Sequence, residues 1–269
     1  TKLTDAGGKK LVSGLGQLPL QDLDLRIRDT QVAEESGVAL GQSLRSLSGL
    51  AKLHLELSNT SMGDSSGSAL GQAFLCCPKI SQLYLSLYNT KLSDVGGRAL
   101  ALGLKSQVMK ALDIRLQGTS VAEETGVALA KSMLFFSELE DLFLAAGGTG
   151  FGDATAVKLG QALNNCCKLK TIALHLYAQI SHTKLTEAGG KKLVCGLGQL
   201  PLQDLDLRIR GTQVAEETGV ALGQSLKSLS GLAKILLDLS DTRMGDASRC
   251  PWTIVAKFVQ PSQAVFVIG

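Results

Sequence analysis

Apolar and polar residues alternate in short stretches that recur along the chain. In "LYLSLYNT", residues 83–90, leucines occupy every second position, and the residues between them are polar or aromatic. A two-residue period places successive side chains on opposite faces of a β-strand, so each stretch predicts a strand with one buried face. We expect eight strands, which start near Leu23, Leu53, Leu83, Leu112, Leu142, Ile172, Leu205 and Ile235.

A different apolar period follows each of these stretches. Apolar residues at i, i+4 and i+7, as at Leu40, Leu44 and Leu47, predict the buried stripe of a short helix. Acidic pairs such as Glu34 and Glu35 precede the stripe, where carboxylates complement the positive N-terminus of a helix. Because a helix returns the chain between successive strands, the strands must pair in parallel.

A threonine at the end of each alternating stretch marks the period of the repeat. Its spacing is 29 or 30 residues, apart from one step of 34, and such a period is typical of a solenoid. We expect its hydroxyl to satisfy backbone groups where the chain leaves the strand. The threonines are Thr1, Thr30, Thr60, Thr90, Thr119, Thr149, Thr183, Thr212 and Thr242.

A glycine recurs between each expected strand and its helix. It allows either a close approach of the neighbouring repeat or a backbone angle that larger residues avoid. These glycines are Gly8, Gly37, Gly67, Gly97, Gly126, Gly190 and Gly219. The segment 1–28 returns almost verbatim at 183–210, which indicates a duplication within the chain.

The repeat has a recognisable consensus, L-x-x-L-x-L-x-L-x-N/D/G-T-x-L-x-x-x-G-x-A-L-x-x-x-L, as in "LAKLHLELSNTSMGDSSGSALGQAF" at 50–74. It resembles the leucine-rich repeats of the ribonuclease-inhibitor-like class, and is most similar to long repetitive arrays of single-celled eukaryotes. The resemblance implies an α/β leucine-rich-repeat solenoid, curved, with a parallel β-sheet on the concave face and helices on the convex face.

The repeat pattern divides the chain into two parts. We expect a solenoid of about eight to nine units over 1–248, and a non-repeat tail or cap over 249–269. The 34-residue step contains "LYAQISHT" at 176–183, which should bulge from the turn after its strand.

Composition narrows the classes of function. A net charge of +3, with basic and acidic residues interspersed, disfavours nucleic-acid binding. No apolar run of 18 residues is present, so we expect no membrane insertion. Four of the six cysteines form two adjacent pairs, which suits a reducing, intracellular compartment better than a disulfide framework. Cys77 and Cys166 align with Leu47 in the helix stripe, so we expect them to be buried and structural.

No pattern indicates an enzyme. The glycines of "GGTGFGD", residues 147–153, lack the spacing of a nucleotide-binding loop, and the histidines lack further ligands at metal-site spacing. We therefore expect no catalytic residue, cofactor or metal.

The variable positions between the strand leucines carry the functional prediction. They hold all three tyrosines, and aromatic residues with arginine on an exposed sheet face are typical of a protein-binding surface. Eight strands spaced by about 4.8 Å span roughly 34 Å, which is wide enough for a partner. The expected partner-binding residues are Tyr84, Tyr88, Tyr177, Phe143, His54, His175, Arg26, Arg28, Arg115, Arg208 and Arg210.

The preferred interpretation is a non-catalytic protein-interaction module that binds a protein partner through the concave sheet. Two alternatives stay open. One is a structural subunit of a larger assembly that makes its contacts through the helical side or the tail. The other, which only the resemblance suggests, is an inhibitor-like regulator of an enzyme.

Overall fold

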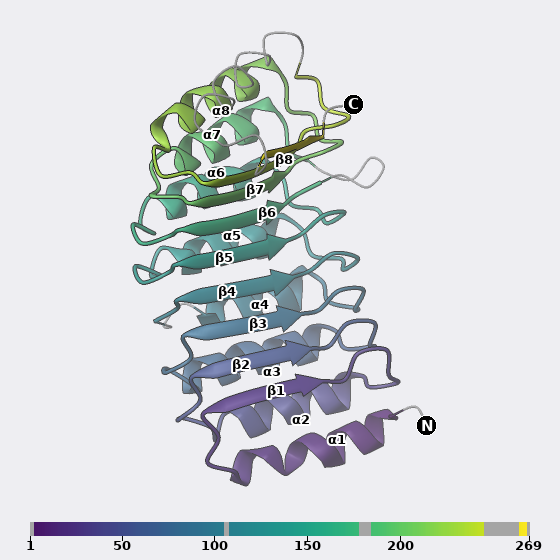
Figure 1. Cartoon of the computed structure of the whole chain (residues 1–269). Coiled ribbons are helices and arrows are strands. Elements are labelled where there is room, and N and C mark those ends of the chain that lie inside the picture. Colours follow the sequence, from purple (N-terminus) through teal and green to yellow (C-terminus); the bar gives the residue numbers. More distant parts are fainter. Residues whose placement is uncertain (1–2, 105–107, 178–183, 245–263, 268–269) are drawn as a thin grey trace.

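The chain forms an α/β solenoid of the leucine-rich-repeat type. The structure, a computed structural model, describes residues 3–104, 108–177, 184–244 and 264–267. One open sheet forms the concave side, and a layer of helices lies behind it (Figure 1). The strands are β1 (Asp22–Arg26), β2 (Lys52–Glu56), β3 (Gln82–Ser86), β4 (Ala111–Arg115), β5 (Asp141–Ala145), β6 (Thr171–His175), β7 (Asp204–Arg208), β8 (Lys234–Asp238) and β9 (Ala264–Val267).

Each strand from β1 to β8 lies beside the next in chain order, and a helix connects them. The helices are α1 (Asp5–Ser13), α2 (Glu34–Leu44), α3 (Asp64–Cys76), α4 (Asp94–Gly103), α5 (Glu123–Met133), α6 (Asp153–Leu163), α7 (Glu187–Leu197) and α8 (Glu216–Ser228), with a short 3-10 helix, η1 (Leu15–Gln17), after α1. The eight predicted strands are confirmed, and each begins one residue before the leucine or isoleucine expected to start it.

The sheet is parallel throughout, and its register pairs equivalent residues of successive repeats. Leu53 lies opposite Leu83, and His54 lies opposite Tyr84. A ninth strand that the leucine pattern does not predict, β9, pairs in parallel with β8 (Figure 1). The rest of the expected tail lies outside the described residues, as do residues 178–183 of the expected bulge.

The inward leucines of the strands and the helix stripes form one continuous core. Leu40, Leu44 and Leu55 are fully buried in it. Cys77 and Cys166 are also fully buried free thiols, as their alignment with the helix stripe predicted. Burial raises the pKa of each thiol to about 11, so neither is a reactive thiolate at neutral pH.

The threonine that marks the period closes a turn at the end of each strand. The hydroxyl of Thr60 donates to the carbonyl oxygen of Leu57 over 2.8 Å, which confirms the predicted role. The same bond recurs at Thr30, Thr90, Thr119, Thr149, Thr212 and Thr242. The residue before the threonine has a positive φ, between 52° and 73°, at Asp29, Asn59, Asn89, Gly118, Gly148, Gly211 and Asp241. Asparagine, aspartate and glycine tolerate this left-handed region best, which explains why they occupy these seven positions.

The recurring glycine lies within the first turn of the helix rather than ahead of it. A Cβ added at Gly8 would lie 2.6 Å from the Ser36 hydroxyl of the next repeat, and one at Gly67 would lie 2.6 Å from the Leu92 side chain. None of the recurring glycines has a positive φ among the described residues. Of the two predicted reasons for glycine, close packing between repeats is therefore the correct one.

The acidic residue that begins each of the helices α1 to α7 caps the helix of the following repeat, which was not expected from the sequence. Asp64, at the start of α3, accepts hydrogen bonds from the backbone N–H groups of Ser93 and Gly96 at the start of α4. Burial raises the pKa of Asp64, but these bonds and one from the Ser93 hydroxyl more than offset that effect and lower it. The same arrangement joins Asp5 to α2, Glu34 to α3, Asp94 to α5, Glu123 to α6, Asp153 to α7 and Glu187 to α8.

Candidate functional site

The side chains that alternate with the core leucines line up in rows across the sheet, because the register pairs equivalent positions. We call the first residues of strands β1 to β6 the starting row: Asp22, Lys52, Gln82, Ala111, Asp141 and Thr171. The third residues of the eight strands form the central row: Asp24, His54, Tyr84, Asp113, Phe143, Ala173, Asp206 and Leu236.

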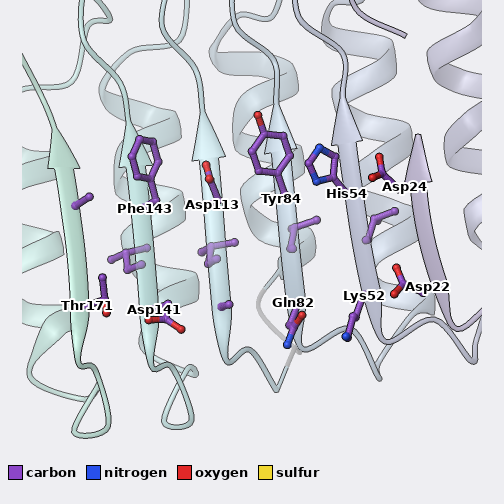
Figure 2. Close-up of a pocket in the computed structure, with 16 residues that line it drawn as sticks. Asp22, Asp24, Lys52, His54, Gln82, Tyr84, Asp113, Asp141, Phe143 and Thr171 are labelled. Carbon is purple, nitrogen blue, oxygen red and sulfur yellow. The ribbon is translucent and has the colours of Figure 1, made fainter. Parts of the chain in front are cut away.

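A groove with a volume of about 460 Å³ runs across β1 to β6 between these two rows. Figure 2 shows Lys52, Gln82 and Asp141 on one side of it and His54, Tyr84 and Phe143 on the other. The small side chains of Ala111 and Ala173 lie between larger neighbours and leave the space open. The groove therefore has an aromatic wall and a polar, charged wall.

The aromatic wall is held in place by contacts between neighbouring strands. The rings of His54 and Tyr84 stack with their centroids 3.9 Å apart and their planes inclined by only 12°. The Tyr84 hydroxyl donates to a carboxylate oxygen of Glu56 over 2.8 Å. Burial, together with this bond, raises the pKa of Tyr84 to about 12, so the phenol remains protonated.

Arg115 joins the two halves of the wall. Its guanidinium lies 4.9 Å from the centroid of the Tyr84 ring and 4.8 Å from that of Phe143, within the range of cation–π contacts. Two bonds of 3.0 Å to the carboxylate of Asp113 fix its orientation. The arginine is therefore positioned before any partner arrives.

The contacts continue beyond Phe143 toward the C-terminal repeats. The Phe143 and His175 rings meet edge to face, with centroids 4.8 Å apart. His175 Nε2 lies 3.0 Å from Asp206 Oδ2. Each of the two carboxylate oxygens of Asp206 also accepts a bond of 2.9 Å from Arg208. Burial raises the pKa of Asp206, but the bonds from His175 and Arg208 outweigh it and lower the pKa to about 2. A carboxylate so firmly ionised suits positioning better than proton transfer near pH 7.

Six of the eleven predicted residues are thus brought together in one network across β2 to β7: His54, Tyr84, Arg115, Phe143, His175 and Arg208. The other five lie apart from it. Arg26, Arg28 and Arg210 are exposed near the two ends of the array, and Tyr88 is exposed beyond β3. The ring of Tyr177 lies against Gly147, where an added Cβ would overlap it.

The sheet face is less open than the alternation predicted. His175 is only 9% exposed, and Ser58, Ser86, Ala145, Gly147 and Ser240 are buried as well. The expectation that His175 would be exposed on the sheet face is therefore wrong. Neighbouring strands bring these side chains into mutual contact, as in the 2.6 Å separation of the Ser58 and Ser86 hydroxyl oxygens.

The starting row was missed because only positions after the first core leucine of each strand were considered. Asp22, Lys52, Gln82 and Asp141 are exposed. Their signal was the same two-residue period extended one step backward, from Leu53 to Lys52 and from Leu142 to Asp141.

Within residues 3–104, 108–177, 184–244 and 264–267, no group of three or more histidine, cysteine, aspartate or glutamate side chains is arranged to hold a metal ion. No helix in those same ranges combines the length and apolar character needed to cross a bilayer.

Comparison with known proteins adds little. No protein-family profile matches the sequence, and neither does any curated protein. Among solved structures, an internalin of Listeria monocytogenes matches with a TM-score of 0.27 and 13% identity, over 96% of this chain and 84% of the internalin. A likeness this weak carries no argument about function.

Proposed function

We propose that the chain is a non-catalytic module that binds a protein partner through its sheet face. The groove of about 460 Å³ beside a preassembled aromatic and arginine wall carries this proposal. Tyrosine and arginine dominate the binding energy of many protein interfaces. Side chains already fixed by stacking and hydrogen bonds lose little further freedom on binding, which favours affinity.

The proposed partner lays an extended segment along the groove, across the strands. Tyr84 and Phe143 would supply apolar contact area, while the exposed Lys52 and Asp141 would select the charges of the segment. We further assign the repeats to the ribonuclease-inhibitor-like class, because each contains a helix and carries the consensus given above. The buried free thiols support an intracellular, reducing location.

The test is a comparison of two variants in the same partner assay. A variant that combines Tyr84→Ala with Phe143→Ala should weaken binding by several kcal/mol, at about 2 kcal/mol or more for each aromatic anchor. Partners would be captured from native extract, identified by mass spectrometry, and then measured by titration with purified protein. Tyr84 also holds its neighbours in place, so its replacement can weaken binding indirectly. The Tyr84→Phe variant and a urea melt of each variant distinguish a lost contact with the partner from a loss of structure in the protein itself.

The matched control changes only the helical side, with Gln42, Gln72 and Gln224 replaced by glutamate. All three are exposed on helices. Normal binding by the variant altered at Tyr84 and Phe143, together with failure of the glutamine variant, would reject the sheet face as the binding surface.

One observation favours a second candidate, an assembly subunit that binds through the helical side. Leu75, Leu102 and Leu134, near the C-terminal ends of α3, α4 and α5, are 54%, 41% and 45% exposed. The positions equivalent to Leu75 in the repeats of α2 and α6 are the polar residues Arg45 and Asn164, each directly after its helix. Loss of partner binding on replacing Leu75 and Leu134 by glutamine, with the sheet face intact, would support this candidate.

A further inference from the structure

One part of the groove is open because Ala111 has the smallest side chain of the starting row. In the register of the sheet, Ala111 lies between Gln82 on β3 and Asp141 on β5. Figure 2 shows these two longer side chains apart on the same side of the groove, with the central row opposite them. We call the space above Ala111 the Ala111 notch, and the residues around it are Gln82, Tyr84, Asp113, Phe143 and Asp141.

Asp141 carries a charge that no basic residue beside it in the starting row offsets. Its neighbours in that row are Ala111 and Thr171. Asp141 is exposed, and within the described part of the chain its carboxylate makes no hydrogen bond or ion pair. Its charge acts on Lys170, but that ammonium donates to Glu140 over 2.7 Å. The carboxylate of Asp141 is therefore available to a ligand.

The other aspartates that begin a strand have a different setting. Asp22 lies opposite Lys52 in the register of the sheet, and Asp204 lies opposite Lys234. A lysine on the adjacent strand, about 4.8 Å away, partly offsets the charge of each of them. Among the first residues of β1 to β8, Asp141 is the aspartate that has no such neighbour.

A second carboxylate faces the notch from the central row. Asp113 lies on β4 between Ala111 and Arg115, and both of its oxygens accept bonds of 3.0 Å from the Arg115 guanidinium. Arg115 offsets the charge of Asp113, so one negative charge remains at the notch, that of Asp141. Lys52 lies three strands from Asp141, about 14 Å away, which exceeds the distance of roughly 8–10 Å over which exposed charges interact in ordinary salt.

We propose that the Ala111 notch binds an arginine side chain of the partner's extended segment, a proposal that rests on the function proposed above. The guanidinium lies over Ala111 and donates to Asp141 on one side and to Asp113 on the other. A carboxylate oxygen has two lone pairs, so Asp113 accepts the new bond without releasing Arg115. The apolar stem of the arginine contacts the rings of Tyr84 and Phe143.

The spacing of the two carboxylates favours arginine over lysine. The Cα atoms of Asp113 and Asp141 are about 8 Å apart, because they lie on adjacent strands and two residues apart along the strand direction. A guanidinium carries donors on more than one edge and can bridge two acceptors, whereas an ammonium is a compact, strongly hydrated point charge. The single positive charge of an arginine also matches the one negative charge that remains at the notch.

The test uses the full chain and a short peptide as the probe. The peptide is acetyl-TVRVT-amide, whose β-branched residues favour an extended backbone. Matched peptides carry lysine or citrulline in place of the arginine, and citrulline keeps the shape of arginine without its charge. In titrations followed by NMR, the arginine peptide should bind about tenfold more tightly than the citrulline peptide, and more tightly than the lysine peptide.

Three variants of the protein connect this preference to the notch. Asp141→Asn should give the arginine and citrulline peptides equal affinity, because it removes the unpaired charge. Ala111→Leu should also abolish the preference, because leucine fills the notch and leaves both carboxylates in place. Asp204→Asn, at the equivalent position of β7 and outside the groove, is the matched control and should change neither affinity. A urea melt of each variant checks that it is folded.

Equal binding of the arginine and citrulline peptides to the parent protein would overturn the proposal, as would a preference that survives Asp141→Asn. Lysine binding as tightly as arginine would overturn it too, and would assign the notch to an ammonium group.

The captured partner distinguishes failure of this proposal from failure of the proposed function. Partner binding that is lost in the variant altered at Tyr84 and Phe143 but unchanged by Asp141→Asn would retain the sheet face and reject the notch. Partner binding that neither change affects, together with arginine-selective peptide binding, would reject the proposed function and retain the notch as an arginine site.

Discussion

The two copies of the duplicated segment show how one peptide acquires different physical properties from its neighbours. In the first copy the helix has 9 residues and, among the residues that the structure describes, β1 has a strand partner on one edge only. In the second copy the helix has 11 residues and β7 pairs with both β6 and β8. Burial in a solenoid is therefore set by the stack as much as by the sequence of the repeat.

Ion pairs on the sheet face also differ in exposure between the two copies. Asp24 and Arg26 form an ion pair, and their side chains are 49% and 64% exposed. The equivalent Asp206 and Arg208 are 25% and 38% exposed, because β6 adds the His175 ring beside them. The identical sequence Asp-Leu-Arg forms a surface ion pair in one copy and part of the network in the other.

The largest expected effect contrasts Leu193, which is 1% exposed, with its equivalent Leu11, which is 52% exposed. Leu193→Ala should lower the free energy of unfolding by about 2–5 kcal/mol, since it leaves a cavity in the core. Leu11→Ala should change it by less than about 0.5 kcal/mol, because that side chain is largely in water. Urea denaturation followed by circular dichroism measures both, and similar costs at the two sites would contradict the contrast in burial.

A smaller effect is expected for glycine replacements at the equivalent positions Gly196 and Gly14. Gly196→Ala should destabilise the protein by about 1–3 kcal/mol, because its methyl group would overlap the backbone of α6. Gly14 has φ −80° and ψ −17°, which alanine adopts without strain. Gly14→Ala should therefore be neutral or stabilise by up to about 1 kcal/mol, through the lower entropy of the unfolded chain. Thermal and urea melts of the pair decide the sign at each site.

The smallest effect concerns acid and the carboxylate of Asp206. Its pKa is lowered from 3.8 to about 2, so it stabilises the fold above pH 4 and loses that contribution as the pH falls from about 4 to about 2. Asp206→Asn should cost at most about 2 kcal/mol at pH 7, and the difference from the parent should vanish near pH 2. Asp24→Asn, which breaks the exposed ion pair with Arg26, should change stability little. A difference at Asp206 that persists at pH 2 would show that lost packing, rather than charge, is responsible.

The sequence was sufficient to predict every element whose signal lies within a single repeat. Alternating leucines located the strands to within one residue, because the buried face of a strand must recur every second position. The hydroxyl bond of Thr60 and the burial of Cys77 followed from position in the unit. Such features depend on contacts that every repeat makes in the same way.

Features that depend on the neighbouring repeat were harder to predict. The carboxylate of Glu34 was expected at its own helix start, and only the stacking of repeats brings it to Ser66. His175 was expected to be exposed, and the Phe143 ring and Asp206 of adjacent strands cover it. The alternation gave the direction of each side chain but not the size of the side chains on either side. The groove could not be predicted for the same reason, because it depends on small side chains lying between large ones.

The carboxylate caps between repeats make unfolding from the N-terminal end of the array different from unfolding from the C-terminal end. Each cap runs from one repeat to the helix of the next, as from Asp94 to Ala122 and Thr125. Peeling a repeat from the N-terminal end strips the cap from the helix that becomes terminal, so the next unit is weakened in turn. Peeling a repeat from the C-terminal end leaves the remaining helices capped. It only exposes to water the carboxylate that had capped the lost helix. Under a steady pulling force, the protein should therefore unfold sooner when the force acts on its N-terminal repeats than when it acts on its C-terminal repeats.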